Sequence, residues 1–138
     1  IGYLCLAANT TANNNTAMGW QTLVTNTTGS ENVAIGYQAL YANTTANNNS
    51  AVGYHALYTN TTGASNTAMG LETLKYNTTA SDNTAFGMQA MRANTTGVYN
   101  VAVGRTALTA NTTANRNTAI GMITMYVLVG IQVFIQQP

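Results

Sequence analysis

Glycine recurs with a strict 17-residue period through most of this chain, and an Asn-Thr-Thr triplet keeps the same spacing. No insertion interrupts the glycine series between its first and last members. An unbroken period of this length is typical of a solenoid, in which each unit buries its apolar face only against its neighbours. We therefore expect function to reside on a surface rather than in a pocket. The recurring glycines are Gly2, Gly19, Gly36, Gly53, Gly70, Gly87, Gly104 and Gly121.

The unit is too short and too rich in Asn, Thr and Gly for a pair of helices, which would need roughly 10 residues each. Short strands fit better, such as 33–35 and 39–41 on either side of a turn at Gly36. The predicted fold is an all-β parallel β-solenoid, or β-roll, of about eight 17-residue coils. Equal residues of successive coils then lie about 4.8 Å apart, and identical Asn and Thr side chains form ladders.

Two columns of equivalent positions are bulky and apolar in every coil, and we predict that both form the core. One column precedes the glycine and the other follows it by four positions, while a small Ala stands before the first. The residues before glycine are Ile1, Met18, Ile35, Val52, Met69, Phe86, Val103 and Ile120. The second column contains Leu6, Leu23, Leu40, Leu57, Leu74, Met91, Leu108 and Met125.

A third column, directly after the glycine, is aromatic or apolar in all coils but one. A 17-residue coil has little interior room for it, so we interpret Trp20, Tyr37 and Tyr54 as part of an assembly interface. A solvated or core stripe is the alternative.

The repeat predicts a solenoid over residues 1–126, followed by a non-repeat apolar strand over 127–138 that caps the stack or docks on another subunit. Apolar residues alternate there, which is typical of a strand. Because the run is short and carries Gln132 and Gly130, we expect no membrane span. The chain starts in the middle of a unit, as a piece of a longer array would. The apolar positions assigned to assembly are Val127, Val129, Ile131, Val133 and Ile135.

Charged residues make up only 5% of the chain and the net charge is +1, whereas roughly 25% charged residues are usual. This composition gives no electrostatic footprint for nucleic acid or an anionic membrane, so we expect neither partner. Cys5 is the only cysteine, and its column otherwise holds Ala or Thr, which indicates a packed small residue.

Candidate catalytic groups are few. Glu31 and Asp82 share a column three coils apart, about 14 Å, too far for paired glycosidase carboxylates, which need roughly 5 to 9.5 Å. His55 and Glu72 are equivalent in adjacent coils, and we expect a surface pair. Lys75 and Arg92 also stack, which is tolerable only if water reaches them. We expect no enzyme activity, no cofactor and no metal.

Every Asn-Thr-Thr triplet is formally an N-glycosylation acceptor. The alternative is a turn that uses Asn for left-handed geometry and Thr for side-chain to backbone hydrogen bonds. The candidate acceptors are Asn9, Asn26, Asn43, Asn60, Asn77, Asn94 and Asn111.

Units such as 32–40, Asn-Val-Ala-Ile-Gly-Tyr-Gln-Ala-Leu, resemble the head repeats of trimeric autotransporter adhesins and the arrays of bacterial and viral tail-fibre proteins. The resemblance covers residues 1 to about 126. It implies a left-handed parallel β-roll, usually trimeric, exposed outside the cell or on a virion. We expect self-association, as a trimer or a filament. We therefore expect a structural component of an extracellular fibre, with a glycan coat if the triplets are modified. The alternatives are a head that binds host-surface glycans, or an ice-binding solenoid using the Thr27, Thr44, Thr61, Thr78 and Thr95 ladder.

Overall fold

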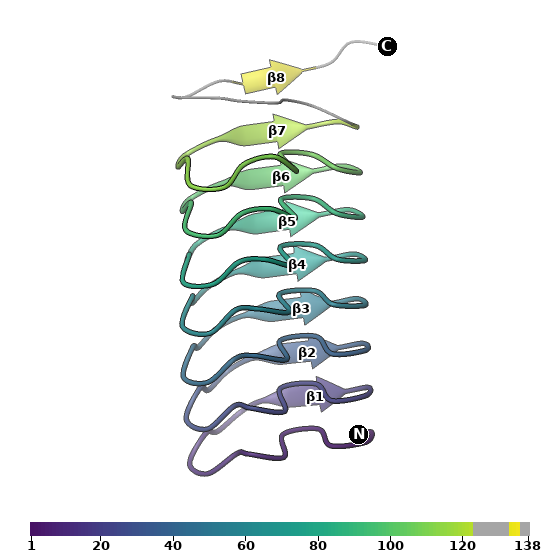
Figure 1. Ribbon diagram of the computed structural model, residues 1–138, viewed down its shortest axis with the longest axis vertical. Coiled ribbons are helices and arrows are strands. Elements are labelled where there is room, and N and C mark those ends of the chain that lie inside the picture. Colours follow the sequence, from purple (N-terminus) through teal and green to yellow (C-terminus); the bar gives the residue numbers. More distant parts are fainter. Residues whose placement is uncertain (123–132, 136–138) are drawn as a thin grey trace.

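The computed structural model describes residues 1–122 and 133–135, and its chain winds into one upright stack of coils (Figure 1). The predicted parallel β-solenoid is confirmed. Each coil contributes one three-residue strand, and all strands form a single parallel sheet in chain order. The strands are β1 (Thr16–Met18), β2 (Val33–Ile35), β3 (Ser50–Val52), β4 (Thr67–Met69), β5 (Thr84–Phe86), β6 (Val101–Val103), β7 (Thr118–Ile120) and β8 (Val133–Ile135).

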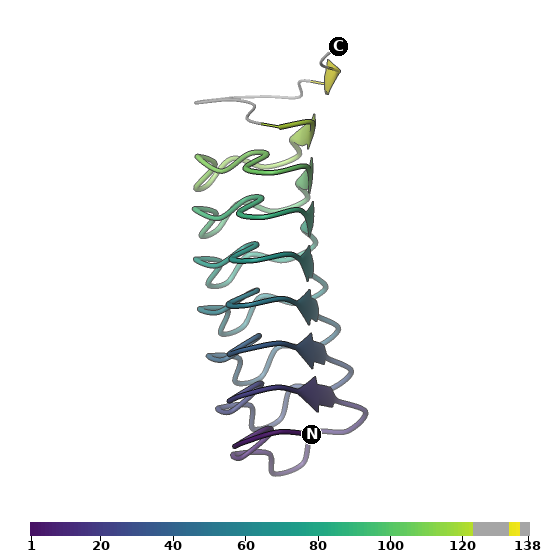
Figure 2. The same cartoon turned by 90° about the vertical axis from the view of Figure 1, so that its right-hand side faces the viewer.

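The sheet register follows the sequence period from β1 to β7. Ala51 pairs with Ala68 and Ala68 with Ala85, so each step advances by one full repeat and brings equivalent positions into line. The last step is shorter, because Thr118 pairs with Val133 rather than with Ile135, which would complete the period. In Figure 2 the strands line up along the right-hand side of the stack and the tight loops project to the left, while paler loop segments extend past the strands in the lower coils.

The glycine column marks a close approach between successive backbones. Gly70 has φ +134°, and a Cβ built on it would lie 2.7 Å from the carbonyl carbon of Gly87. An L side chain would therefore meet both backbone strain and a clash. This is the physical reason that glycine occupies the same place in every coil.

The interior contains the Leu/Met column, as predicted, together with the Ala column. Leu57 and Ala51 are fully buried, as are their equivalents in the middle coils. The prediction that the residues before glycine belong to the core is wrong. Side chains alternate across a strand, so the buried Ala forces its neighbours outward. Among these outward residues, Met18 is 46% exposed, Met69 39%, Phe86 38%, Val103 37% and Ile120 55%.

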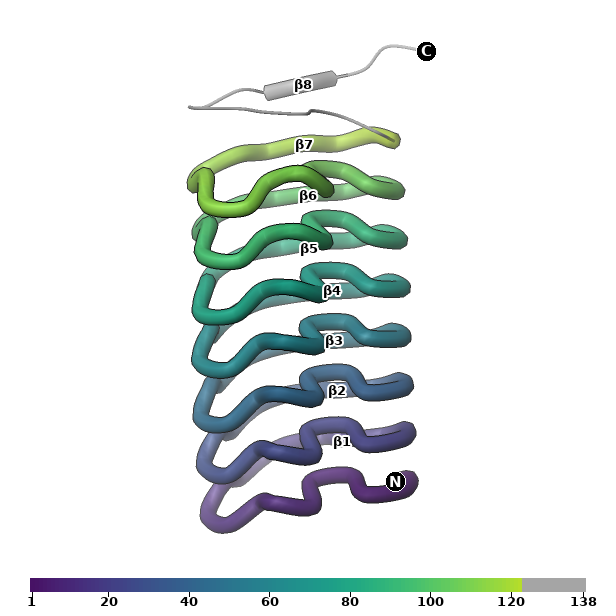
Figure 3. The backbone as a smooth tube through the Cα atoms, in the orientation of Figure 1, coloured from purple at the N-terminus to yellow at the C-terminus, as the bar shows by residue number. Residues whose placement is uncertain are grey.

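Two columns of asparagine complete the interior. Asn60 donates from Nδ2 to the Gly63 carbonyl oxygen at 2.8 Å and to Asn43 Oδ1 of the preceding coil at 3.3 Å. In the second column, Asn49 Oδ1 accepts the backbone N–H of Asn66 at 2.9 Å. The buried amides thus satisfy one another and the loop backbone, which lets a narrow coil close without a large apolar core. The smooth trace in Figure 3 shows how closely the coils repeat one another.

Candidate functional site: the surface columns of the solenoid

Most of the exposed large apolar side chains stand directly before or directly after the column glycines. We call the exposed residues directly before and directly after the glycines the apolar stripe. Trp20, Tyr37 and Tyr54, predicted as an assembly interface, are 46%, 43% and 45% exposed. Its other strongly exposed members are Ile1, Tyr3, Met18, Met69, Leu71, Phe86, Val103, Ile120 and Met122.

Stacking between coils orders the aromatic part of the stripe. The rings of Tyr3 and Trp20 stack with centroids 4.2 Å apart, and those of Tyr37 and Tyr54 with centroids 5.1 Å apart. Each ring is held by the one above or below it, so the aromatic surface is organised before any partner arrives.

The C-terminal residues assigned to assembly fall largely outside the described residues, as Val127, Val129 and Ile131 do. Val133 and Ile135 are the two ends of β8, whose backbone pairs with Thr118 and Ile120 of β7. This segment therefore continues the sheet at the position of β8.

The candidate N-glycosylation sites form the first buried ladder. Asn26, Asn43, Asn60, Asn77 and Asn94 have no exposed surface. Their Nδ2 atoms donate both to the carbonyl three positions ahead and to the asparagine of the preceding coil, as in Asn77. A glycan on Nδ2 would have to remove the side chain from the stack. Asn9 is exposed and Asn111 is half-buried, both nearer the ends of the described stack.

The two threonines of each triplet differ in their use. Thr61 Oγ donates to the Thr78 carbonyl at 3.1 Å, and Thr44, Thr78 and Thr95 repeat this contact one coil apart. The donors of the proposed ice-binding ladder are therefore occupied within the stack. The next threonine of each triplet, such as Thr62, is exposed in every described coil, and its hydroxyl is free to bind water or a ligand.

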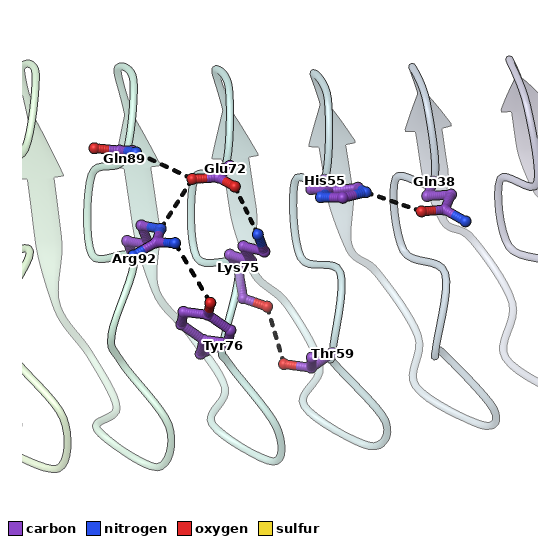
Figure 4. Close-up of polar contacts among 8 residues, drawn as sticks. All are labelled: Gln38, His55, Thr59, Glu72, Lys75, Tyr76, Gln89 and Arg92. Atoms are coloured by element: carbon purple, nitrogen blue, oxygen red, sulfur yellow. Dashed lines mark hydrogen bonds and ion pairs between the residues drawn. The ribbon is translucent and has the colours of Figure 1, made fainter.

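A charged cluster occupies the loop face of the middle coils (Figure 4). Glu72 accepts from Lys75 Nζ at 2.6 Å, from Arg92 Nε at 2.9 Å and from Gln89 Nε2 at 3.0 Å. The expected pair with His55 does not form, because His55 Nε2 bonds Gln38 Oε1 at 2.8 Å instead. Water still reaches Lys75 and Arg92, whose side chains are 15% and 35% exposed. Glu72 also forms an ion pair with each of them, which offsets their mutual repulsion.

These contacts change the ionisation of two groups. The hydrogen bond from Lys75, aided by Gln89 and by the charges of Lys75 and Arg92, lowers the pKa of Glu72 to about 2 despite partial burial. Burial and then the Lys75 charge lower the pKa of His55, and Glu72 opposes this only in part. The carboxylate is thus a strongly paired anion at neutral pH, a structural role rather than that of a proton donor.

The other acidic candidates do not converge. Glu31 and Asp82 are exposed, with two coils between them. Residues 1–122 contain no group of three or more His, Cys, Asp or Glu side chains able to hold a metal ion. Cys5 is half-buried and accepts a 2.9 Å hydrogen bond from Thr22 Oγ, a packed environment as expected.

The outward orientation of the residues before glycine was missed by sequence reasoning, although the sequence held a signal for it. That column ranges in size from Val to Phe, whereas the preceding Ala never changes from Ala17 to Ala119. A close-packed interior tolerates little change of volume, so the variable column is the exposed one.

No protein family, curated protein or solved structure matches this chain. The part of the chain that the structure describes contains no helix long and apolar enough to cross a membrane.

Proposed function

We propose that this chain is a structural segment of an extracellular fibre or filament, a stiff rod that extends and displays a surface. The observation that carries the proposal is the continuous hydrogen bonding along the stack. Six backbone donors outside the strand ladder join the coil of residues 67–83 to its two neighbours. These donors are Gly70, Glu72, Leu74, Tyr76, Thr78 and Asp82.

Rigidity follows from the distribution of these bonds around the coil. Three of them, Leu74, Tyr76 and Thr78, donate to the following coil, and the other three, Gly70, Glu72 and Asp82, donate to the preceding one. Bending the stack at any point would stretch bonds on one side, and the side-chain ladders add to that resistance. A rod built this way can span a distance and carry force without a binding pocket.

Self-association, as a trimer or filament, is part of the proposal. The exposed Trp20, Tyr37 and Tyr54 side chains support it, because contiguous apolar surface on a protein marks a contact with a partner. Placement outside the cell or on a virion rests on the resemblance to adhesin heads and tail fibres.

Cryo-electron microscopy of the native material tests the fibre proposal. We expect continuous filaments with an axial repeat of about 4.8 Å. Discrete short particles with no continuity would contradict it.

A head that binds surface glycans is the second candidate. The exposed column of Thr11, Thr28, Thr45, Thr62, Thr79, Thr96 and Thr113 supports it, because its hydroxyls recur at every described coil and are open to hydrogen bonding. Binding to a glycan array that is lost in a Thr62→Ala, Thr79→Ala double variant, but kept in Ser65→Ala, would favour this function. Absence of binding would remove this candidate and leave the fibre as the one proposed function.

A further inference from the structure

We infer that the apolar stripe is the docking surface for a second copy of this chain, laid side by side with the first. This inference deepens the proposed fibre function, on which it rests for its biological purpose, by naming the surface and the partner. The stripe runs along the stack because its residues are equivalent in successive coils.

The stripe has the chemical character of an interface. Arg105 is the only charged residue next to the glycines in the described part of the chain, and the glycines themselves have no side chain to hold a partner away. Depletion of charge with enrichment in aromatic residues and Met distinguishes the buried centre of protein interfaces from ordinary surface. A solvated face would instead carry the charges and amides found in the column of Glu31, Asp82 and Arg116.

The exposed area is sufficient for a stable contact. Ten large side chains of the stripe, from Met18 to Met122, are between 37% and 57% exposed. With roughly 180 Å² for a large side chain, each exposes about 80 Å² and the ten together roughly 800 Å². This is about the area that each partner contributes to a standard protein interface, ~800 Å².

The period identifies the partner. A molecule that covers the whole stripe must present complementary side chains every ~4.8 Å along a straight line. A second solenoid of this sequence has that spacing by construction, so its ladders can interdigitate with those of the first in a dry contact. A globular partner would match only one or two coils and leave the rest of the stripe in water.

Trp20 provides a direct measurement, because it is the only tryptophan of the chain and is 46% exposed within the stripe. As the concentration of the intact chain increases, sedimentation velocity should show association. Over the same range, the Trp20 emission should shift to shorter wavelength and become less sensitive to acrylamide.

The decisive variant is the double substitution Met69→Lys, Leu71→Lys, which places two cations in the stripe three coils away from Trp20. We expect association to weaken by about 100-fold or more, because unpaired like charges would face each other across the contact. Trp20 should then keep its long-wavelength emission at all concentrations. The matched control, Asn48→Lys with Ser65→Lys, adds the same charge at exposed positions whose column already holds Arg116. It should associate as the unmodified chain does.

Three results would overturn the inference: an intact chain that stays monomeric, association that leaves Trp20 emission unchanged, or a stripe variant that associates normally. Small-angle scattering of the stripe variant should still show an elongated particle, which verifies the fold. Native filaments built of single unpaired rods would retain the fibre proposal and overturn this one. Discrete particles that pair through the stripe would support this inference and contradict the fibre proposal.

Discussion

Replacing Asn60 with Asp tests whether the buried amide ladder holds the coils together. The substitution keeps the shape of the side chain and the acceptor that Asn77 Nδ2 uses at 2.9 Å. It removes the two donations from Asn60 Nδ2, to Gly63 and to Asn43. The Gly63 carbonyl still accepts from Asn49 at 2.9 Å, whereas Asn43 Oδ1 loses its donor inside the stack.

The expected cost follows from these contacts. Two lost hydrogen bonds contribute about 2 kcal/mol, and one buried acceptor without a donor adds about 1 to 3 kcal/mol. We therefore expect Asn60→Asp to lower the free energy of unfolding by about 3 to 5 kcal/mol at neutral pH. Burial raises the folded-state pKa of the new carboxyl above its unfolded value. The loss of unfolding free energy should thus be complete only above the folded-state pKa of this carboxyl. It should shrink as pH falls toward the unfolded-state pKa, because the protonated acid can donate one hydrogen bond.

Denaturant unfolding followed by circular dichroism measures the global effect, with Asn48→Asp as the control. Asn48 is exposed at φ 61°, a conformation that Asp also adopts. Since repeat proteins unfold in parts, amide hydrogen exchange should show the loss concentrated in the coils around residues 43–77. A difference between the two variants below about 0.5 kcal/mol, the usual range for neutral surface changes, would refute the reasoning.

Three further predictions follow from other parts of the stack. Gly70→Val should destabilise the fold by about 3 kcal/mol or more through backbone strain and overpacking. Thermal melting compares it with the control Ala64→Val, whose column already contains Val98. Equal melting temperatures of the two variants would contradict the prediction. The folded pKa of Glu72, about 2, lies below the unfolded value of 4.5, so its contribution is present above pH 4.5 and is lost as pH falls toward 2. Glu72→Gln should remove this acid-dependent loss and lower the free energy of unfolding by about 1 to 2 kcal/mol at pH 7 after solvent screening. A pH–stability curve identical to that of the exposed control, Glu31→Gln, would disprove it. Peptide mass spectrometry of the native chain should find no N-glycan on Asn26, Asn43, Asn60, Asn77 or Asn94, and a glycan there would show that the ladder does not form in that material.

Sequence reasoning predicted the parallel coils because the period fixes which residues stack, whatever the shape of the coil. It predicted the Leu57 column as core because that column holds Leu or Met in every coil. It misplaced the Val52 column because size and apolarity were used without the alternation of the strand, in which the small Ala51 takes the inside position. It also missed the Glu72–Arg92 contact, because spacing between equivalent positions does not reveal diagonal pairs between long side chains.

The outward position of the residues before glycine links the surface of the stack to its interior. So short a coil encloses one Leu or Met together with alanine and paired asparagine amides. The remaining large and more variable apolar residues are therefore placed outside. The interior ladders give every coil the same outline, and that uniformity lines up Met18, Tyr37 and Tyr54 with their equivalents in a stripe. A sequence with a larger apolar core could hide those residues, but it would lose the strict repetition from which the stripe arises. The exposed apolar surface is therefore a consequence of the narrow coil, and we propose that an identical rod covers it because such a rod has the same spacing at every coil.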